Sequence, residues 1–334
     1  MARLPVLLMC PAGFEHVVVQ IAERELAHFA SSQVDSGYIR ATTAASVRQL
    51  RDFPCATNVF HVVASVPKSS LTADLQHLAR ALRTMQRPGR LPRHGAFRLR
   101  IHDSGRFASD DSVPARRLEA DLARWSGLQP SRREARNEFW VVRRRGPADS
   151  VLATKLTGGN PRVRPGVLRP EVCAALARVV PLDTASLVVD PFAGSGAVGV
   201  ACLQAGARRV WVNDPDPTAL DGVRTLPRSL RERLRATTLD VRDLDVGPAT
   251  VSVIVTDPPW GHYGDHGVAV ASLHDDLANF AVRALVTDGS LVILTGAGPD
   301  AISAVTCRKE LVPAQSFPVL INGRKAQILV ATRA

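Results

Sequence analysis

A short apolar run in the C-terminal half sets the strongest limit on how this chain folds. Residues 251–261 read V-S-V-I-V-T-D-P-P-W-G, in which β-branched residues are followed at once by turn-forming ones. This pattern predicts a strand that is buried on both faces of a parallel sheet. Asp257 then stands at the carboxyl end of the strand, where open α/β sheets bind their ligands.

The four residues that follow the strand suit methylation of an exocyclic amine on a base. Such a nitrogen is a poor nucleophile because its lone pair is delocalised into the ring. The Asp257 carboxylate and the Pro258 carbonyl can each accept an N–H bond, while Pro258 and Pro259 lack an N–H and restrict the backbone. Trp260 offers a ring on which the base can stack. We therefore name these four residues as catalytic candidates; the alternative is a simple turn after a strand.

A second strand runs into a glycine-rich loop, D-P-F-A-G-S-G-A-V-G at 190–199, which a helix follows. Glycines at such a turn let a cofactor approach the backbone and the helix N-terminus. Gly194, Gly196 and Gly199 match the dinucleotide pattern G-x-G-x-x-G, and Asp214 lies 20 residues after Gly194. The first glycine of that pattern, however, normally closes the strand directly. The longer loop that begins at Asp190 suits a methionine moiety better than a pyrophosphate.

Aspartates end four predicted strands in turn and decide between the two cofactors. Asp190, Asp214, Asp240 and Asp257 are separated by 24, 26 and 17 residues, as consecutive βα units require. An acid after the second strand can accept both ribose hydroxyls, and one after the third can accept the adenine amine. A pyridine nucleotide enzyme has no use for Asp-Pro-Pro-Trp at the fourth strand. The sequence thus favours S-adenosyl-L-methionine over NAD(P).

The excess of basic over acidic residues lies entirely in the N-terminal half of the chain. Residues 1–165 hold 26 Lys and Arg against 14 Asp and Glu, whereas residues 166–334 hold 16 against 17. Phosphate neutralisation dominates the affinity of proteins for nucleic acids, so this asymmetry predicts a polyanion-binding half joined to a catalytic half. An arginine-rich genome would explain the preference for Arg over Lys but not the asymmetry.

Alternating helix and strand patterns organise the first 67 residues. Strands are predicted at Arg3–Cys10, Tyr38–Ala41 and Asn58–Val66, with helices at Gly13–Ala30 and Ser46–Leu50 between them. This order is compatible with a ferredoxin-like unit. Beyond it, basic residues interleave with aromatic ones on two further predicted strands, and we expect them to face RNA. The RNA-binding candidates are Arg98, Arg100, Arg143, Arg144 and Arg145.

Other features bound the setting of the protein. No apolar run approaches the roughly 20 residues that cross a bilayer, and the five cysteines show no C-x-x-C pair, which favours a reduced cytoplasm. His262, Asp265, His266 and His274 could suggest a metal site, but no thiolate accompanies them, so no metal is predicted. Residues 261–267 are expected to form a mobile substrate loop instead.

Taken together, the motifs resemble a known enzyme family. The loop D-P-F-A-G-S-G, the later N-D-P-D and D-P-P-W-G, and a final strand pair around F-P-V-L-I-N-G-R-K-A-Q-I-L-V are similar to those of the THUMP-containing RNA guanine-N2-methyltransferases, a group that includes the Trm11-like and Trm14-like tRNA enzymes. The resemblance implies an α/β fold: a Rossmann-like class I methyltransferase domain with a mostly parallel seven-stranded sheet, preceded by an α+β ferredoxin-like and THUMP region. The implied division is 1–67 ferredoxin-like, 68–147 THUMP-like, 148–170 linker and 171–334 methyltransferase.

The resemblance also implies roles for single positions. Asp190, Phe192, Ala193, Gly194 and Gly196 would form the loop at the methionine end of the cofactor, with Asp214 at its ribose and Asp240 at its adenine. The product would be N2-methylguanosine in structured RNA, tRNA first and rRNA second, made by a monomer with or without a small activator subunit.

One departure from the family keeps other functions open. The last position of Asp-Pro-Pro-Trp is more often tyrosine or phenylalanine, and tryptophan is typical of adenine-N6-methyltransferases of RNA. The chain places the cofactor loop before this motif, an order that favours the guanine family. N6-adenine methylation of RNA or DNA, and a non-catalytic RNA-binding protein on a methyltransferase scaffold, are the alternatives.

Overall fold

The computed structural model describes residues 3–86, 94–158, 167–182, 187–261 and 270–334. The chain divides into two compact units, and one of the boundaries between them falls within helix α1 (Glu15–Glu25). The first unit comprises Met1–Met9 and Ala22–Gly159, and the second comprises Cys10–Ile21 and Asn160–Ala334.

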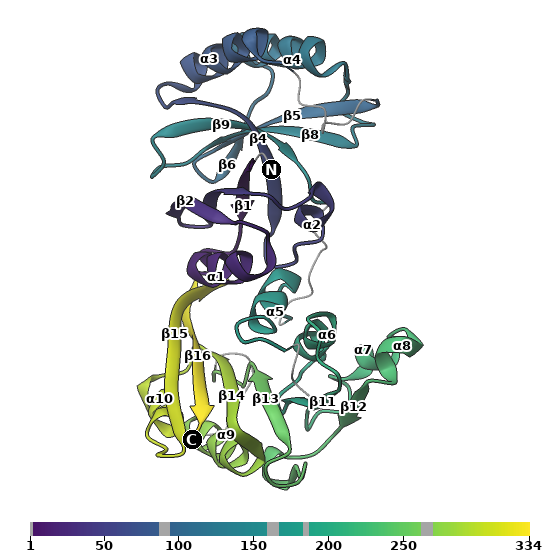
Figure 1. Ribbon diagram of the computed structural model, residues 1–334, viewed down its shortest axis with the longest axis vertical. Coiled ribbons are helices and arrows are strands. Elements are labelled where there is room, and N and C mark those ends of the chain that lie inside the picture. Colours follow the sequence, from purple (N-terminus) through teal and green to yellow (C-terminus); the bar gives the residue numbers. More distant parts are fainter. Residues whose placement is uncertain (1–2, 87–93, 159–166, 183–186, 262–269) are drawn as a thin grey trace. The chain divides into compact units, whose positions relative to one another are not determined.

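The first unit is built on one curved sheet of nine strands (Figure 1). Its strands are β1 (Leu4–Met9), β2 (Ala30–Asp35), β3 (Tyr38–Thr43), β4 (Asn58–Pro67), β5 (Ala96–Asp103), β6 (Arg106–Ala108), β7 (Gln129–Pro130), β8 (Asn137–Arg143) and β9 (Asp149–Lys155). Their order is β2-β3-β1-β4-β9-β8-β5-β6, with β7 beside β5. Neighbours are antiparallel except for β5, which runs parallel to β7 and β8.

Two helices, α3 (Leu71–Thr84) and α4 (Val113–Ser126), cover one face of the part of this sheet formed by β4, β5, β8 and β9 (Figure 1). The short α2 (Val47–Arg51) lies elsewhere in the unit. Ser70 and Ser112 cap the two long helices, since each hydroxyl accepts the backbone N–H three residues on. Leucines at helical spacing then face the sheet. The core between them contains Leu75, Leu78, Leu82, Leu118, Leu122, Phe97, Leu99, Ile101, Phe139 and Val141.

Two sequence-based predictions in this unit are wrong. The helix expected to reach Ala30 ends at Glu25, and residues 30–35 form the edge strand β2, whose mostly polar, exposed side chains show no apolar alternation. The linker expected at 148–170 begins inside the sheet, because β9 pairs with both β4 and β8 and is buried from Ser150 to Thr154. Residues 159–166 of that segment lie outside the described residues.

The second unit carries a seven-stranded sheet in the order β12-β11-β10-β13-β14-β16-β15. The strands are β10 (Val188–Asp190), β11 (Val210–Asn213), β12 (Leu234–Thr237), β13 (Val251–Thr256), β14 (Leu285–Thr295), β15 (Leu311–Ile321) and β16 (Arg324–Arg333). The first five strands in this order are parallel, and β16 is antiparallel to both of its neighbours. The helices are α5 (Pro170–Leu176), α6 (Ala197–Gln204), α7 (Asp221–Arg224), α8 (Arg228–Arg231), α9 (Val270–Ala284) and α10 (Pro299–Thr306), with a 3₁₀ turn at Val241–Asp243.

Two positions in the second unit require a glycine. A Cβ on Gly199 of α6 would lie 2.4 Å from Cγ1 of Val212, so a glycine is needed where the helix crosses β11. The turn between β15 and β16 is Asn322-Gly323, and both residues have positive φ, as a two-residue hairpin turn requires. The predicted fold class, an α/β protein with a mostly parallel seven-stranded C-terminal sheet after an α+β N-terminal region, is confirmed.

Candidate active site

The loops after the parallel strands of the second unit enclose a cavity of about 580 Å³. Strand order explains its position, because β10 and β13 lie side by side and the chain leaves β10 toward β11 but β13 toward β14. Most of the residues singled out in the sequence line this one cavity: Phe192, Gly194, Asp214, Asp240, Asp257, Pro258, Pro259 and Trp260. Asp190, Ala193 and Gly196 do not line it but support its wall.

Asp190 ends β10 and is 1% exposed. Its Oδ1 accepts bonds from the Thr256 hydroxyl at 2.7 Å and from the Phe192 backbone N–H at 3.3 Å. Its Oδ2 is buried and has no hydrogen-bond partner among the described residues. Burial raises the pKa of this carboxyl to about 7, and the nearby Asp214 adds to the effect while the two hydrogen bonds oppose it. Buried acceptors are normally paired, so a cationic group of a ligand could donate a hydrogen bond to Oδ2 of Asp190.

The glycines of the loop have conformations that other residues avoid. Gly194 and Gly196 have φ of +50° and +77°, and Gly196 is the N-cap of α6. A Cβ on Gly196 would lie 2.6 Å from Cγ2 of Val223, so the site admits no side chain there. Ala193 is buried, and its N–H donates to the Asn213 carbonyl at 2.8 Å, which ties the loop to the end of β11.

Asp214 and its neighbour hold the loops together. Oδ2 of Asp214 accepts the Gly194 N–H at 2.8 Å, which aligns this carboxylate with the glycine loop. Asn213, which sequence reasoning missed, is fully buried, and its amide donates to the carbonyls of Pro191 at 3.2 Å and Leu239 at 2.9 Å. Its oxygen accepts the Thr237 hydroxyl and the Leu239 N–H. One side chain therefore joins the loops after three strands.

Asp240 lies at the cavity wall in an ion pair with Arg242. Oδ1 accepts the Arg242 backbone N–H at 2.9 Å and its Nε at 2.9 Å, while Oδ2 accepts Nη2 at 2.8 Å. These bonds lower the pKa of Asp240 to about 2, so the group stays ionised. Arg242 also lines the cavity and was not predicted from the sequence.

Asp257 and Trp260 form one hydrogen-bonded pair at the end of β13. The indole Nε1–H donates to Oδ1 of Asp257 at 2.9 Å. Oδ2 of the same carboxylate makes no hydrogen bond with a described residue and remains available as an acceptor. Burial raises the pKa of Asp257 to about 7; the bond from Trp260 opposes this shift, and Asp190 adds to it.

A glycine that the sequence did not single out holds the indole ring in place. A Cβ on Gly296, just beyond β14, would lie 2.5 Å from Cε3 of Trp260 and 2.8 Å from Cζ3. The ring therefore packs directly against the Gly296 backbone. Because β14 lies beside β13 in the sheet, the residue that follows β14 positions the aromatic residue of the loop after β13.

Further lining comes from the β15–β16 turn and from α9, namely Ile321, Asn322, Arg324, Ser272 and Asp276. Asn-Gly between two β-rich runs predicts the hairpin, but only the tertiary structure brings its tip to the cavity.

The metal hypothesis concerns residues that the structure describes only in part. His274 is buried, and its ring contacts the Val270 carbonyl at 2.9 Å and the Thr295 hydroxyl at 3.1 Å. Burial lowers the pKa of this histidine. His262, Asp265 and His266, together with all of the predicted substrate loop beyond Gly261, lie outside the described residues. Elsewhere in the described part of the chain, no three His, Cys, Asp or Glu side chains are grouped to hold a metal ion.

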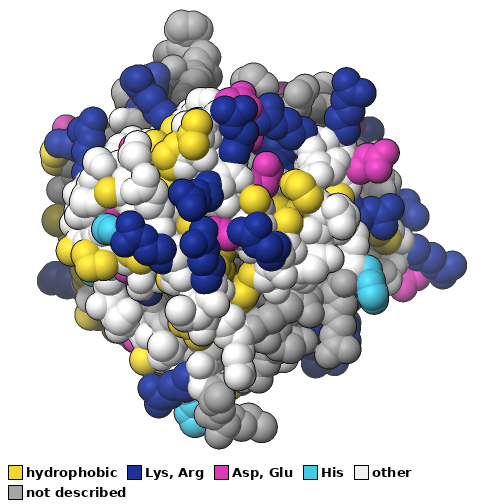
Figure 2. All heavy atoms as spheres, turned by 90° about the horizontal axis from the view of Figure 1, so that it is seen from above, with side chains coloured by type: hydrophobic (Ala, Val, Ile, Leu, Met, Phe, Trp, Pro, Cys, Tyr) yellow, Lys and Arg dark blue, Asp and Glu magenta, His cyan; other side chains and the backbone are white. Residues whose placement is uncertain are grey.

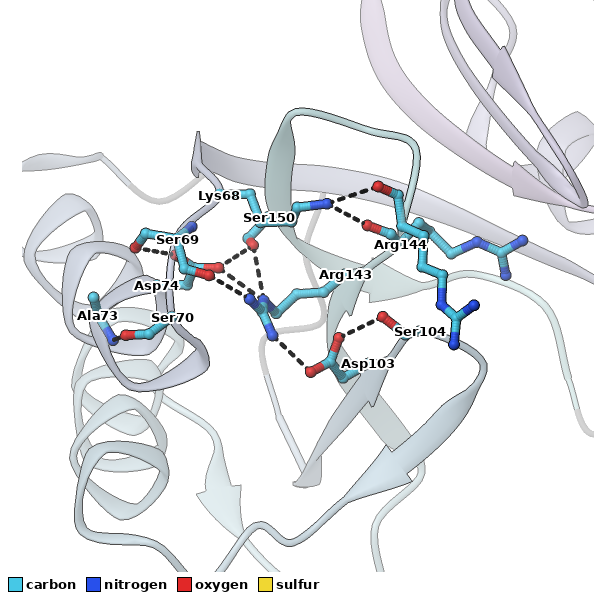
Figure 3. A network of polar contacts seen from close by, with 11 residues as sticks. Lys68, Ser69, Ser70, Ala73, Asp74, Asp103, Ser104, Arg143, Arg144 and Ser150 are labelled. Carbon is cyan, nitrogen blue, oxygen red and sulfur yellow. Dashed lines mark hydrogen bonds and ion pairs between the residues drawn. The ribbon is translucent and has the colours of Figure 1, made fainter.

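The five predicted RNA-binding arginines differ in exposure, and the expectation that Arg143 faces RNA is corrected because its side chain is buried. Its side chain is 8% exposed and lies in a network between α3 and the ends of β5 and β8 (Figure 3). Its guanidinium donates to Asp74 at 2.8 Å, to Asp103 at 2.6 Å and to the Ser69 carbonyl at 2.6 Å. A strand-end arginine looks exposed in sequence, but Asp74 is also fully buried and needs a counter-charge.

The other four arginines keep at least part of their surface. Arg145 is exposed, and Arg98, Arg100 and Arg144 are half-buried. Arg144 donates to the Ser36 carbonyl. Figure 2 shows further Lys and Arg side chains on the side of α3 and α4. The exposed arginines of these two helices are Arg80, Arg83, Arg116, Arg117 and Arg124.

Comparisons with known proteins concern the family and the fold of this chain. The family model of the RMKL-like methyltransferase domain, UPF0020, matches residues 159–327. No curated protein has a significant sequence match to this chain. None of the described helices is long and apolar enough to cross a membrane.

Solved structures share the fold over the whole chain. TrmN from Thermus thermophilus is 21% identical, with a TM-score of 0.78, over 99% of this chain and 100% of that one. SMU.472, in complex with SAH, is 13% identical, with a TM-score of 0.70, over 99% and 98%. A predicted N6-adenine-specific DNA methylase from Listeria monocytogenes is 14% identical, with a TM-score of 0.66, over 99% and 96%.

Proposed function

Because the chain belongs to the RMKL-like methyltransferase domain family, we propose that it methylates the exocyclic N2 of guanine in RNA, with tRNA as the substrate. One observation carries the proposal. The glycine loop and strand-end acids line the same cavity as Asp257 and Trp260, so a methyl donor and an amine acceptor can meet there.

The cofactor is S-adenosyl-L-methionine, which when bound supplies an electrophilic methyl group on a sulfonium. The residues present fit it. The unpartnered Oδ2 of Asp190 and the open glycine loop suit the charged methionine end. Asp214, bonded to the Gly194 N–H, retains acceptor capacity for ribose hydroxyls, and Asp240 for an adenine amine.

The acceptor amine is proposed to bind at Asp257. Since Trp260 occupies Oδ1, the free Oδ2 accepts one N–H, and the Pro258 carbonyl accepts the other. The two bonds draw the nitrogen toward tetrahedral geometry, and catalysis comes mainly from positioning. The amine nitrogen takes the methyl group directly, so no covalent enzyme intermediate is needed. Asp257 need not act as a full general base, because the positively charged product amine can lose its proton to water. The indole, held between Asp257 and Gly296, lines the cavity where the base would stack.

The first unit is proposed to bind the RNA. It contains most of the basic residues of the N-terminal half, nearly all of them arginines, and polyanions are held mainly by such charges. We retain the ferredoxin-like assignment for 1–67 and the THUMP-like assignment for the following region, extended through β9 to Lys155. The base would be presented out of its stack. A cytoplasmic monomer, with or without an activator subunit, fits this proposal.

The test is incubation of the purified protein with radiolabelled S-adenosylmethionine and tRNA or rRNA that lacks its modifications, followed by nucleoside analysis. Labelled N2-methylguanosine in tRNA is the expected product. Label in rRNA alone would contradict tRNA as the substrate. Absence of label from every RNA and DNA tested, although the cofactor binds, would favour a non-catalytic RNA-binding protein on a methyltransferase scaffold.

A second candidate is N6-methylation of adenine. Trp260 favours it, and the Listeria monocytogenes protein of similar fold carries that description. The same nucleoside analysis separates the two, because labelled N6-methyladenosine would replace the guanosine product.

A further inference from the structure

One strand of the first unit separates apolar from basic side chains. On β5, Phe97, Leu99 and Ile101 are buried in the core beneath α3 and α4. Arg98, Arg100 and His102 alternate with them, so they lie on the opposite face of the sheet and are half-buried. The helices therefore leave this second face of β5 uncovered.

A short hairpin adds an exposed aromatic ring to that face. β6 pairs with β5 so that Phe107 lies opposite His102. The Phe107 ring centroid is 5.5 Å from that of His102 and 5.1 Å from that of Trp140 on β8, in edge-to-face arrangements. Phe107 is nevertheless 55% exposed. We call Arg98, Arg100, His102, Phe107 and Trp140 the aromatic face; Trp140 forms its buried base.

An arginine already stacks on the exposed ring. The guanidinium carbon of Arg100 lies 4.6 Å from the centroid of Phe107 and 5.8 Å from that of Trp140. Such a cation steadies the ring. Since more than half of Phe107 remains exposed, it can still receive a second planar group.

Hydrogen-bonding capacity also remains on this face. Nε of Arg98 and Nδ1 of His102 are buried and have no hydrogen-bond partner among the described residues. Buried polar atoms are normally paired. A small rotation of either side chain would let Nε of Arg98 or Nδ1 of His102 form a hydrogen bond with an incoming phosphate or base edge.

The acids near the aromatic face are already neutralised. Glu138 accepts the Trp140 indole N–H at 2.8 Å and pairs with Lys155 at 3.9 Å. Asp103 pairs with the buried Arg143 at 2.6 Å (Figure 3). The positive charge of Arg98 and Arg100 is thus not cancelled locally, and the face suits a polyanion that carries planar groups.

We propose that the aromatic face is a stacking site for an unpaired base of single-stranded RNA, with Phe107 as its platform. The proposal rests on the proposed function only in taking RNA as the substrate. Single-strand binders combine cationic grooves with aromatic rings in the same way. A double helix does not fit, since its bases are not free to stack on a side chain.

The experiment measures binding of a fluorescently labelled single-stranded RNA dodecamer by anisotropy. Phe107→Ala and Phe107→Leu are expected to weaken binding about 5- to 150-fold, because neither offers a π face. Phe107→Trp should bind at least as well as the wild type. Val113→Ala is the matched control, since Val113 is another exposed apolar residue of the same unit, on α4 and 71% exposed, and the change should leave binding unaltered.

A charge variant separates stacking from phosphate contact. Arg100→Met should reduce the slope of log affinity against log salt concentration by about 0.7, whereas Phe107→Ala should leave the slope unchanged. Binding of Phe107→Leu within twofold of Val113→Ala overturns the proposal, as does equal affinity for a DNA dodecamer or no binding of single strands by the wild type. If the same preparation still methylates structured RNA, only this inference fails; if it methylates no RNA, the proposed function fails.

Discussion

Replacement of Gly296 by alanine should uncouple methyl transfer from cofactor binding. The added Cβ would lie 2.5 Å from Cε3 of Trp260, whereas ordinary contacts begin at 3.4 Å. The ring must therefore move by about 0.9 Å, and its bond of 2.9 Å to Asp257 cannot persist in the same geometry. A misplacement of about 1 Å near the reacting atoms costs on the order of a hundredfold in rate.

The assay is single-turnover methyl transfer at saturating S-adenosylmethionine, with the cofactor dissociation constant measured by calorimetry. Gly296→Ala should lower the rate about a hundredfold and leave the cofactor constant within about threefold, because the glycine loop is untouched. Gly298→Ala is the matched control, since a Cβ there meets nothing within 4 Å.

A double variant tests the stated cause. Trp260→Phe removes the ring atoms that the new Cβ would strike, so Gly296→Ala should add little to it, and the two effects should be strongly non-additive. A Gly296→Ala rate within threefold of Gly298→Ala, or full additivity with Trp260→Phe, would refute the argument that Gly296 acts through the indole.

Three further predictions concern titration and buried polar groups. Because Trp260 occupies Oδ1 of Asp257, a proton on this carboxyl would sit on Oδ2 and turn it from an acceptor into a donor. With the pKa at about 7, the single-turnover rate should therefore rise with pH up to that value and level off above about 8; a flat profile from pH 5.5 to 8.5 would exclude this role. Asn213→Ala should lower the free energy of unfolding by about 3 kcal/mol and weaken cofactor binding, as measured by urea unfolding and calorimetry, because four hydrogen bonds are lost at a buried site; a loss below 1 kcal/mol would contradict it. Arg143→Met should destabilise the fold by about 3–5 kcal/mol, since it leaves Asp74 buried without its counter-charge. Replacement of the exposed Arg145 by Met should instead change stability by less than about 0.5 kcal/mol and weaken only RNA binding. If Arg143→Met weakened RNA binding without loss of stability, Arg143 would again be an RNA contact.

Local patterns were sufficient for most of the second unit. The buried run before Asp257, the glycine loop after Asp190 and the Asn-Gly turn each carry their meaning within about ten residues. Periodicity and turn chemistry act at that range, so strands, turns and strand-end acids could be predicted. The carboxyl ends of parallel strands share one edge, which is why the spacing of the aspartates also predicted a common cavity.

The sequence did not predict β2 and β9, because neither strand shows a clear apolar alternation between turn residues. β2 is polar because it lies at the sheet edge, and β9 is flanked by Gly and Pro residues that resemble a linker. Their partners, β3 for the first and β4 and β8 for the second, determine that they are strands.

The sequence by itself determined the order of the βα units, the glycine loop and the acids at the strand ends, because these depend on neighbours along the chain. Only the tertiary structure decided which charges are available. Arg143 is buried against Asp74, while Arg100 lies on an exposed phenylalanine. Likewise, Asn213 and Gly296 become important only because they meet loops that are distant in sequence. Burial and contact across strands set these roles, and no local pattern encodes them.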